Sequence, residues 1–155
     1  MLARTLCPHR LNAAADHPDV LPHLGLGGPA ELSALISDAA NITLQTDHGG
    51  FVVQRVEPGV YEVHSIFTPE GRGGLTQATA DGLRYVFTAT DAMEVRTKVP
   101  AYNVPAHRLA LASGFVEVFA RDNAWTAPDG SLCGVSYRSI TFDQWRARDT
   151  ALVAE

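Results

Sequence analysis

The sequence is poor in the residues that build disulfide-rich, zinc-binding or membrane-spanning proteins. Its 155 residues include two cysteines, Cys7 and Cys133, and no Cys-x-x-Cys pair, so we expect neither a disulfide framework nor a thiol-based metal or redox site. No apolar run approaches the ~18 residues of a membrane span. Residues 1–10 contain no apolar stretch of signal-peptide length. These absences favour a soluble, cytoplasmic protein with reduced thiols.

Positive charge is also scarce, and nearly all of it is arginine. Twelve basic residues, of which Lys98 is the only lysine, stand against seventeen acidic residues, and the formal net charge is −5. Nucleic acids and anionic membranes attract positive protein surfaces, so this balance argues against both as partners. Duplex DNA would need a local arginine patch to compensate. We attribute the arginine bias to genome composition rather than to function.

Apolar residues, in contrast, are plentiful. They make up 46% of the chain, which is too high a fraction for a disordered protein. A chain of this length buries about two-thirds of its unfolded surface around one core. We therefore expect a single domain over residues 1–155.

Hydrophobic alternation predicts a run of antiparallel strands in the middle of the chain. Residues 41–46 alternate between apolar and polar positions, with Ile42 and Leu44 on one face, and we interpret 51–56 as the return strand and 60–67 as a third strand. The segments Asp47-His48-Gly49-Gly50 and Glu57-Pro58-Gly59 between them have the composition of hairpin turns. Because short turns join antiparallel neighbours, we expect a three-stranded meander here.

A helical connection follows the meander. Apolar residues recur at helical spacing over residues 74–89, and alternation returns over residues 93–99. A helix between two strands of one sheet makes those strands, 60–67 and 93–99, parallel neighbours. A parallel pair inside a mostly antiparallel sheet splays locally and leaves a cleft between its two strands.

The remaining elements are shorter. Asn103 is a good N-cap for a helix that Gly114 ends. We also expect a first strand over residues 2–6, two short helices within 8–38 with the second starting near Pro29, strands over 115–120 and 132–140, and a C-terminal helix through Trp145 that Thr141 or Ser139 caps. The result is an α/β (α+β) fold with a mixed, mostly antiparallel sheet of six to seven strands. One central parallel pair is splayed into a V, and helices cover both faces.

Two sequence motifs resemble those of the GNAT (GCN5-related) N-acetyltransferase superfamily. The stretch Asn103-x-x-Ala106-x-x-Leu109-x-x-x-x-Gly114-Phe115 matches the pattern of the family's C-terminal half-site position for position. Residues 63–74 resemble its fourth strand and pyrophosphate loop, whose usual form is Arg/Gln-x-x-Gly-x-Gly/Ala. Within the superfamily, the chain most resembles small GNAT-like proteins encoded by bacteriophages.

The resemblance implies a binding site for acetyl-coenzyme A (acetyl-CoA), used as the acyl donor. Backbone N–H groups at a helix N-terminus attract phosphate, and arginine adds a charge-assisted contact. Glycines let the phosphate approach and tolerate positive φ, which we expect at Gly73. A backbone N–H near Phe67 and Thr68 would bind the thioester oxygen. The residues expected to bind the coenzyme are Phe67, Thr68, Gly71, Arg72, Gly73, Gly74, Leu75, Asn103 and Arg108.

The chain departs from the family pattern at two points. The loop aligns with either Glu70 or Arg72 in its first position, and in both alignments Leu75 takes a place that is usually small. We therefore expect weaker coenzyme binding or a shifted loop. Ala110 stands where many members carry a tyrosine that protonates the leaving thiolate. Tyr102 and Ser113 are the nearby hydroxyl candidates, and a thiolate also leaves with little help.

The expected fourth strand carries two candidates for a general base. Alternation puts Glu62 and His64 on one face, about 7 Å apart. A base with a pKa near the working pH would take the proton of an amine acceptor. We rank His64 above Glu62 because the ordinary pKa of histidine suits this role. The alternative is that this face is solvated and both side chains are simply surface residues.

We expect no metal site and no covalent catalysis. The acidic and histidine residues near the N-terminus have a spacing that fits no standard set of metal ligands; they are His9, Asp16, His17, Asp19 and His23. Cys7 and Cys133 have no assigned histidine partner that would make either of them a nucleophile.

The leading hypothesis is an acyl-coenzyme-A-dependent N-acyltransferase, which transfers an acetyl group to a primary amine by direct attack on the thioester. One alternative is a catalytically degenerate GNAT-fold binding or structural protein associated with phage. Another is a GNAT-like enzyme that modifies nucleobases. The resemblance also implies a homodimer. The sequence does not identify the amine acceptor.

Overall fold

The computed structural model describes residues 2–24 and 31–154. The strands are β1 (Ala3–Arg4), β2 (Ile42–Thr46), β3 (Gly49–Glu57), β4 (Val60–Phe67), β5 (Glu94–Pro100), β6 (Val116–Thr126) and β7 (Leu132–Thr141). The helices are α1 (His9–Ala15), α2 (Ser33–Ser37), α3 (Leu75–Ala89), α4 (Val104–Ala112) and α5 (Phe142–Ala154), with 3-10 turns η1 (Leu21–His23) and η2 (Pro69–Gly74). The helix start expected near Pro29 lies outside the described residues.

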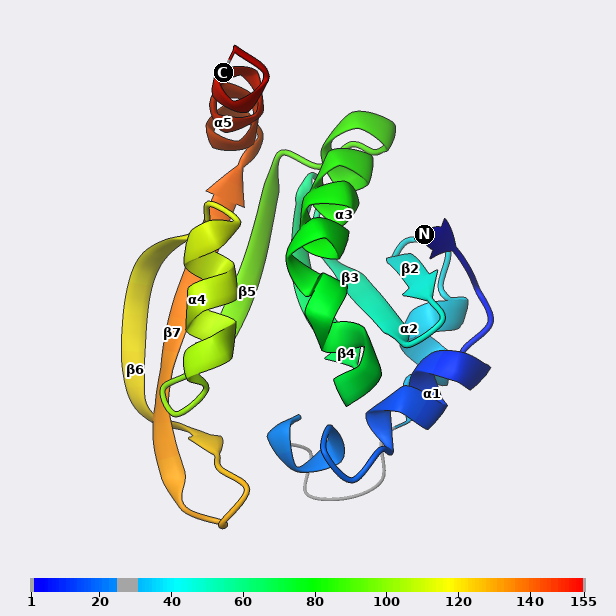
Figure 1. The fold of residues 1–155 in the computed structure, drawn as a ribbon, viewed down its shortest axis with the longest axis vertical. Coiled ribbons are helices and arrows are strands. Elements are labelled where there is room, and N and C mark those ends of the chain that lie inside the picture. Colours follow the sequence, from blue (N-terminus) through cyan, green and yellow to red (C-terminus); the bar gives the residue numbers. More distant parts are fainter. Residues whose placement is uncertain (1, 25–30, 155) are drawn as a thin grey trace.

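The strands form one sheet in the order β1-β2-β3-β4-β5-β7-β6 (Figure 1). Neighbouring strands are antiparallel except β4 and β5, which are parallel and connected through α3. This confirms the predicted fold class, a mixed and mostly antiparallel sheet with one central parallel pair. A single helical crossover is the reason, because it brings β5 back to the same end of the sheet from which β4 starts.

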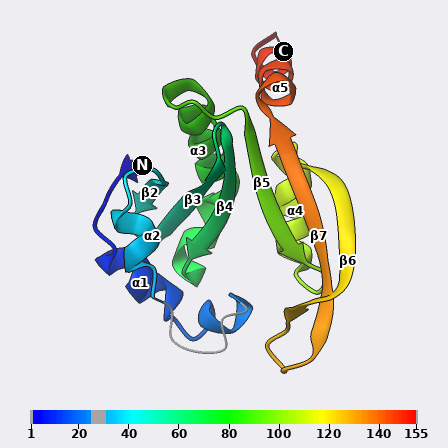
Figure 2. The same ribbon diagram turned by 180° about the vertical axis from the view of Figure 1, so that it is seen from behind.

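The parallel pair is joined at its first residues only. Residues 60–62 pair with residues 94–96, and no later residue of β4 pairs with β5 in the described chain. Beyond this point the two strands diverge toward their C-terminal ends, at the bottom of Figure 2. The V that the sequence predicted between these strands is therefore present. We call the space between the diverging parts of β4 and β5 the gap.

Each face of the sheet has its own apolar core. On one face, buried side chains of the sheet meet α3 and α4; they include Phe51, Tyr61, Phe67, Leu83, Val86, Phe87, Val95, Val99 and Ala110. On the other face, Val52 and Ile66 meet α1 and α2, which contribute Leu11, Ala14, Ala15 and Ile36. Because side chains alternate along a strand, β4 contributes to both cores at once.

The second core covers only half of the sheet. α1 and α2 lie over β2, β3 and β4, whereas the same face of β5, β7 and β6 carries no helix among the described residues (Figure 2). Phe119 on β6 is accordingly 45% exposed. It stacks on Tyr137 of β7 with ring centroids 4.3 Å apart. The layer of α1 and α2 therefore ends along β4, next to the gap.

The ends of α4 form as their residues predict. Asn103 Oδ1 accepts a hydrogen bond from the Ala106 N–H at 3.2 Å, which satisfies one of the free donors of the first turn. After α4, Gly114 has a φ of +92°, which is a conformation that glycine adopts without a steric cost. Asn103 and Gly114 therefore set where α4 begins and ends.

The C-terminal helix begins with a reciprocal cap. The Thr141 N–H donates to Gln144 Oε1 at 2.9 Å, and Thr141 Oγ1 accepts from the Gln144 N–H at 3.2 Å. α5 continues past Trp145, whose ring stacks on Phe87 with centroids 5.4 Å apart. Within residues 2–24 and 31–154, no helix has the length and apolar character to cross a membrane.

Two strands are longer than the sequence indicated. β6 continues to Thr126 rather than ending at Ala120, because bulges between Glu117 and Phe119 and between Arg121 and Trp125 absorb its irregular residues. At the start of β3, Gly49 and Gly50 belong to the strand and not to the turn. A Cβ on either glycine would lie 2.0 or 2.1 Å from a carbonyl oxygen of the adjacent strand. Only glycine allows strands to approach this closely here.

Candidate functional site

The side chains with acid–base chemistry gather where β4 and β5 part. Glu62 is the last residue of β4 that pairs with β5, and His64 follows it on the same face. The opposite face of β4 carries Tyr61 and Phe67, which are buried against α3. Alternation therefore directs Glu62 and His64 to the α1 side of the sheet, at the border between its covered and uncovered halves.

A lysine from β5 reaches across the gap. Lys98 Nζ lies 3.2 Å from Glu62 Oε1. Lys98 comes two residues after Arg96, the last residue of β5 that pairs with β4, so its side chain crosses the point of divergence. The Glu62 side chain is 17% exposed and the Lys98 side chain 46%. Lys98 was not among the residues predicted from the sequence. Its position two residues after Arg96 places it on the same face of β5, and this was the feature that could have identified it.

His64 favours its neutral form. Burial lowers the pKa of His64 below its ordinary value of 6.5; the Glu62 carboxylate opposes this effect and the Lys98 ammonium adds to it. His64 is partly buried. A neutral imidazole beside an ion pair is able to accept a proton at neutral pH.

The diverging part of β4 directs backbone groups into the gap. The Thr68 N–H donates to the His48 carbonyl at 3.0 Å, toward β3. Because N–H groups alternate in direction along a strand, those of Ser65 and Phe67 point toward β5, where the ladder has ended. Two residues were expected to bind a thioester oxygen. The Phe67 N–H points into the gap, whereas the Thr68 N–H already donates to the His48 carbonyl. Ser65 is exposed although it lies on the helix-covered face, so the gap is open between α3 and α4.

The glycine-rich segment after β4 forms η2, which runs directly into α3. Gly73 does not have the expected positive φ; the described residues with positive φ lie elsewhere. A Cβ on Gly73 or Gly74 would meet no atom within 4 Å, so both leave the backbone open at the start of α3. A Cβ on Gly71 would lie 2.8 Å from the Cβ of His48. Gly71 is therefore needed for packing, whereas Gly73 and Gly74 leave room for a ligand.

η2 itself carries two charged side chains, Glu70 and Arg72. Arg72 is exposed, and its Nη2 donates to the Asp19 carbonyl at 3.0 Å; the other N–H groups of a guanidinium remain able to bind an anion. The backbone N–H of Glu70 itself and the Thr68 hydroxyl lower the pKa of Glu70. Glu70 thus adds a negative charge to the turn that leads into α3, and such a charge opposes phosphate binding there.

The other residues expected around the coenzyme lie on α3 and α4. Leu75 is the first residue of α3, and Asn103 precedes the first residue of α4. Arg108 is exposed on α4. Ala110, which replaces the family's tyrosine, is buried. Ser113 is at the opposite end of α4 from Asn103, so it is not near η2.

A segment after α1 contacts both sides of the open end of the gap. His23 Nδ1 lies 3.0 Å from Tyr102 Oη, and the Asp19 carbonyl accepts from Arg72. Tyr102 belongs to the β5–α4 connection and Arg72 to η2, so residues 19–23 join the two halves of the molecule. Burial raises the pKa of Tyr102, so its hydroxyl stays protonated and able to donate. Among the residues with described placement, no three His, Cys, Asp or Glu side chains are grouped to hold a metal ion.

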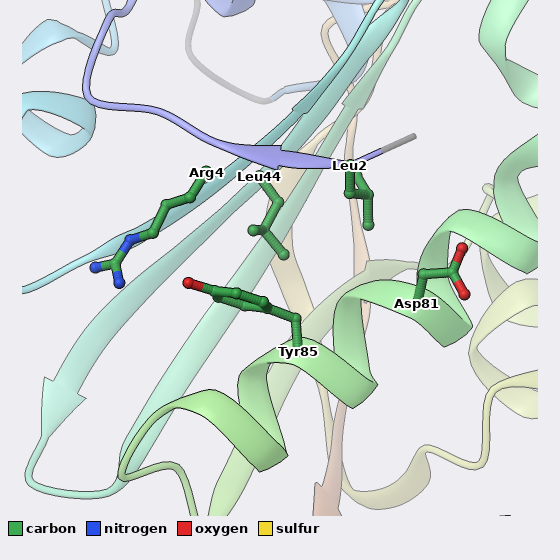
Figure 3. A pocket seen from close by; sticks show the side chains of 5 residues that line it. All are labelled: Leu2, Arg4, Leu44, Asp81 and Tyr85. Carbon is green, nitrogen blue, oxygen red and sulfur yellow. The ribbon is translucent and has the colours of Figure 1, made fainter.

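Two hollows lie away from the gap. One of about 280 Å³ lies between β1, β2 and α3 and is lined by Leu2, Arg4, Leu44, Asp81 and Tyr85. Figure 3 shows Tyr85 extending from α3 toward Leu44 and Arg4. The other, of about 340 Å³, lies between α1 and the β2–β3 turn and includes Thr68 and Glu70. Neither is lined by Glu62, His64 or Lys98.

Solved structures of N-acetyltransferases have the same fold. A spermidine N-acetyltransferase from Vibrio cholerae in complex with CoA and spermine matches with a TM-score of 0.79 and 17% identity, over 94% of this chain and 97% of that chain. A GCN5-related N-acetyltransferase from Brucella melitensis matches with a TM-score of 0.70 and 18% identity, over 99% of this chain and 80% of that chain. A mutant of the Vibrio cholerae spermidine enzyme matches with a TM-score of 0.66 and 20% identity, over 76% and 74%.

At these identities the likeness shows the fold, and the fold is the one that the two motifs predicted. No family profile and no curated protein sequence matches the chain.

Proposed function

We propose that this GNAT-fold protein is an acyl-coenzyme-A-dependent N-acyltransferase, which transfers an acetyl group to a primary amine. The observation that carries the proposal is the gap between β4 and β5, with unpaired backbone N–H groups and a neutral imidazole beside an ion pair. Acyl transfer from a thioester to an amine needs a place for the donor, a hydrogen bond to the thioester oxygen and a base. The gap supplies all three.

The acyl donor binds along the gap in this proposal. The diphosphate of acetyl-CoA lies at the start of α3, where Gly73 and Gly74 leave the backbone open and Arg72 supplies a cation. The pantetheine arm runs between α3 and α4 past Ser65. The thioester oxygen then accepts a hydrogen bond from the N–H of Ser65 or Phe67, which stabilises the negative charge that develops there. Asn103 and Arg108 border this site from α4.

The acceptor amine approaches from the face that carries His64. The neutral imidazole takes a proton from the acceptor ammonium, and the amine nitrogen attacks the thioester carbon. A C–N bond forms, the C–S bond breaks and the thiolate of coenzyme A leaves. The Glu62 carboxylate favours the protonated form of His64, so it stabilises the imidazolium that this step produces.

The thiolate needs a proton at the end of the reaction. Ala110 has no hydroxyl, and Ser113 lies at the far end of α4. Tyr102 keeps its proton and stands at the open end of the gap. We therefore assign the proton to Tyr102 or to water, since a thiolate is a good leaving group that needs little help.

Polyamines are one class of acceptor within this proposal. The Vibrio cholerae neighbour is named for spermidine and was solved with spermine. A polyamine carries several positive charges, and the net charge of −5 on this chain favours its approach. Peptide amines and small aromatic amines are the comparison acceptors.

A GNAT-fold protein that binds the coenzyme without acyl transfer is the second candidate. Two observations favour it: the Glu70 carboxylate at the start of η2 and the alanine at position 110. The first weakens the phosphate site and the second removes the family's proton donor. Neither removes the base or the backbone donors, so we rank this candidate below the transferase.

Calorimetric titration with acetyl-CoA tests the donor site, and release of free thiol in the presence of an amine panel tests transfer. Binding with amine-dependent thiol release supports the transferase. Binding without thiol release supports the second candidate. Absence of binding at high micromolar coenzyme rules out the proposal.

A further inference from the structure

Lys98 places a primary amine inside the gap in which the proposed reaction takes place. It is the only lysine of the chain. Its Nζ lies 3.2 Å from Glu62 Oε1 and 5.9 Å from the centroid of the Tyr137 ring. A carboxylate and an aromatic face both attract an ammonium group, so this amine is held at a defined place rather than extended into solvent.

The register of the sheet brings this amine to the level of the candidate base. Glu62 of β4 is paired with Arg96 of β5, and the two strands are parallel. Two further steps along each strand lead to His64 and to Lys98, which therefore stand at the same level on opposite sides of the gap. Lys98 also contacts Glu62, which lies on the same face of β4 as His64 and two residues before it. The Lys98 side chain is also 46% exposed, so a second molecule can reach it.

A substrate amine must lie beside a base and next to the thioester, and Lys98 meets the first condition by its position. The second follows from the proposed donor site, because the thioester lies in the gap that the Lys98 side chain crosses. We propose that Lys98 is an acceptor for its own active site, so that the chain transfers an acetyl group from acetyl-CoA to Lys98 Nζ. This inference rests on the proposed function and adds a modification site to it.

The transfer starts from the ammonium form of Lys98 and balances without any further reactant. His64 takes one proton, and the free amine attacks the thioester carbon. A C–N bond forms and the C–S bond to coenzyme A breaks. Of the two protons that the nitrogen loses on becoming an amide, one ends on the thiol of coenzyme A and the other passes through His64 to water.

The product changes the site that made it. The acetylated nitrogen carries no charge, so the ion pair with Glu62 is lost and an amide occupies the place between the two strands. Each chain therefore reacts once at this residue. The modified protein is expected to acetylate an external amine more slowly than the unmodified protein, because the acetyl group stands on the acceptor side of the gap.

Intact-protein mass spectrometry tests the inference. The full chain is incubated with acetyl-CoA and no amine, and we expect it to gain one acetyl group that peptide mapping locates at Lys98. Lys98→Arg keeps the positive charge beside Glu62 and is the matched control, which should gain no acetyl group at this position. His64→Gln should slow the modification by about 10²-fold, the loss typical of removing a general base.

A small thioester is the control for uncatalysed acetylation. S-acetyl-N-acetylcysteamine has the same reacting group as acetyl-CoA but no nucleotide or diphosphate. At equal concentration, acetyl-CoA should modify Lys98 at least about tenfold faster, because binding holds its thioester next to the amine. The difference should vanish in protein unfolded by urea. Equal rates for the two donors on the native chain would overturn the inference.

Calorimetric binding of acetyl-CoA separates the two possible failures. If the coenzyme binds and an external amine is acetylated while Lys98 stays unmodified, the inference is wrong and the proposed function stands. If the coenzyme does not bind, the proposed function fails and the inference fails with it.

Discussion

His64 is the side chain whose protonation the rest of the site controls. Burial and the Lys98 ammonium favour the neutral imidazole, whereas the Glu62 carboxylate favours the protonated one. The balance lowers the pKa of His64 below 6.5, so the imidazole is mostly neutral at pH 7. In the proposed reaction, kcat/KM should fall toward acid as His64 becomes protonated, with a midpoint below that value.

Changing the charged neighbours should move this acid limb in opposite directions. Glu62→Gln removes the charge that favours the imidazolium, so the pKa of His64 falls further and the midpoint moves to lower pH. Lys98→Met removes the ammonium that disfavours the imidazolium, so the pKa of His64 rises and the midpoint moves to higher pH. The measurement is kcat/KM against pH with a responsive amine.

His64→Gln completes this series. It should lower kcat/KM by about 10²–10⁴-fold and remove the acid limb. If this variant retains near-wild-type activity and the same pH dependence, His64 is not the base, and a water chain held by backbone groups becomes the better account.

Arg72 supplies the side-chain cation of the proposed phosphate site. Arg72→Ala should weaken acetyl-CoA binding by about 1.5–3 kcal/mol, the range for a hydrogen bond to a charged group, and the value should lie near the lower end because Arg72 is exposed. Arg146→Ala is the matched control, since Arg146 is exposed on α5 at the opposite end of the sheet from α3's first turn (Figure 1). Equal dissociation constants for the two variants would assign Arg72 to its contact with Asp19.

At the scale of elements, the sequence predicts what short-range signals determine. α4 was predictable because its cap Asn103 and its stop Gly114 lie at its own ends. The parallel pairing of β4 and β5 was predictable because a helix between two strands of a sheet allows little else. In each case the physical cause acts within the segment or between elements that follow one another.

The sequence fails where the cause lies in another part of the chain. Gly49 has the composition of a turn, yet it is a strand residue because the backbone of β4 approaches it. The length of β6 depends on bulges against β7, which alternation does not reveal. In the sequence, Lys98 is one polar residue among several on the β5 segment. Its contact with Glu62 depends on the register between β4 and β5. Partners of this kind are visible only once the sheet is assembled.

Two glycines of η2 allow a packing role to be separated from a ligand-binding role. Gly71 is the packing position and Gly73 the proposed binding position. Gly71→Ala puts a Cβ 2.8 Å from the Cβ of His48 and 3.1 Å from Phe67 Cδ1, so the free energy of unfolding should fall by about 1–3 kcal/mol. Gly73→Ala meets no atom and needs no positive φ, so stability should stay the same or rise by up to about 1 kcal/mol. Thermal or urea unfolding measures both.

Gly73→Ala is expected to be the more stable of the two variants but to bind acetyl-CoA more weakly. Gly73→Ala places a methyl group on the backbone that the diphosphate approaches, so it should weaken binding although the fold is intact. A stable Gly73→Ala protein with an unchanged dissociation constant would place the diphosphate elsewhere.

At the scale of the whole molecule, two half-sheets meet at one short ladder. Residues 60–62 and 94–96 provide the strand pairing between them, and residues 19–23 contact both halves at the other end of the gap through Arg72 and Tyr102. Contacts therefore join the two half-sheets at both ends of the gap, and among the described residues no strand pairing joins them between these contacts.

Tyr102→Phe tests whether this closure and proton donation use the same hydroxyl. The variant loses the contact with His23 Nδ1, so the free energy of unfolding should fall by no more than about 0.5–1.5 kcal/mol. If Tyr102 protonates the thiolate, kcat should fall while the dissociation constant of acetyl-CoA stays the same. An unchanged kcat would leave water as the donor and restrict Tyr102 to holding residues 19–23 in place.

The early end of the β4–β5 ladder divides the amides of β4 into two kinds that deuterium exchange can distinguish. The N–H groups of His64 and Ile66 point toward β3, which runs alongside them, whereas those of Ser65 and Phe67 point into the gap. Amides without a partner exchange faster, so we expect fast exchange at residues 65 and 67 and slow exchange at 64 and 66. Any ligand in the gap should slow only the first pair, which makes nuclear magnetic resonance of four neighbouring amides a measure of occupancy that needs no turnover. Uniformly slow exchange in the free protein would mean that the gap is closed in solution.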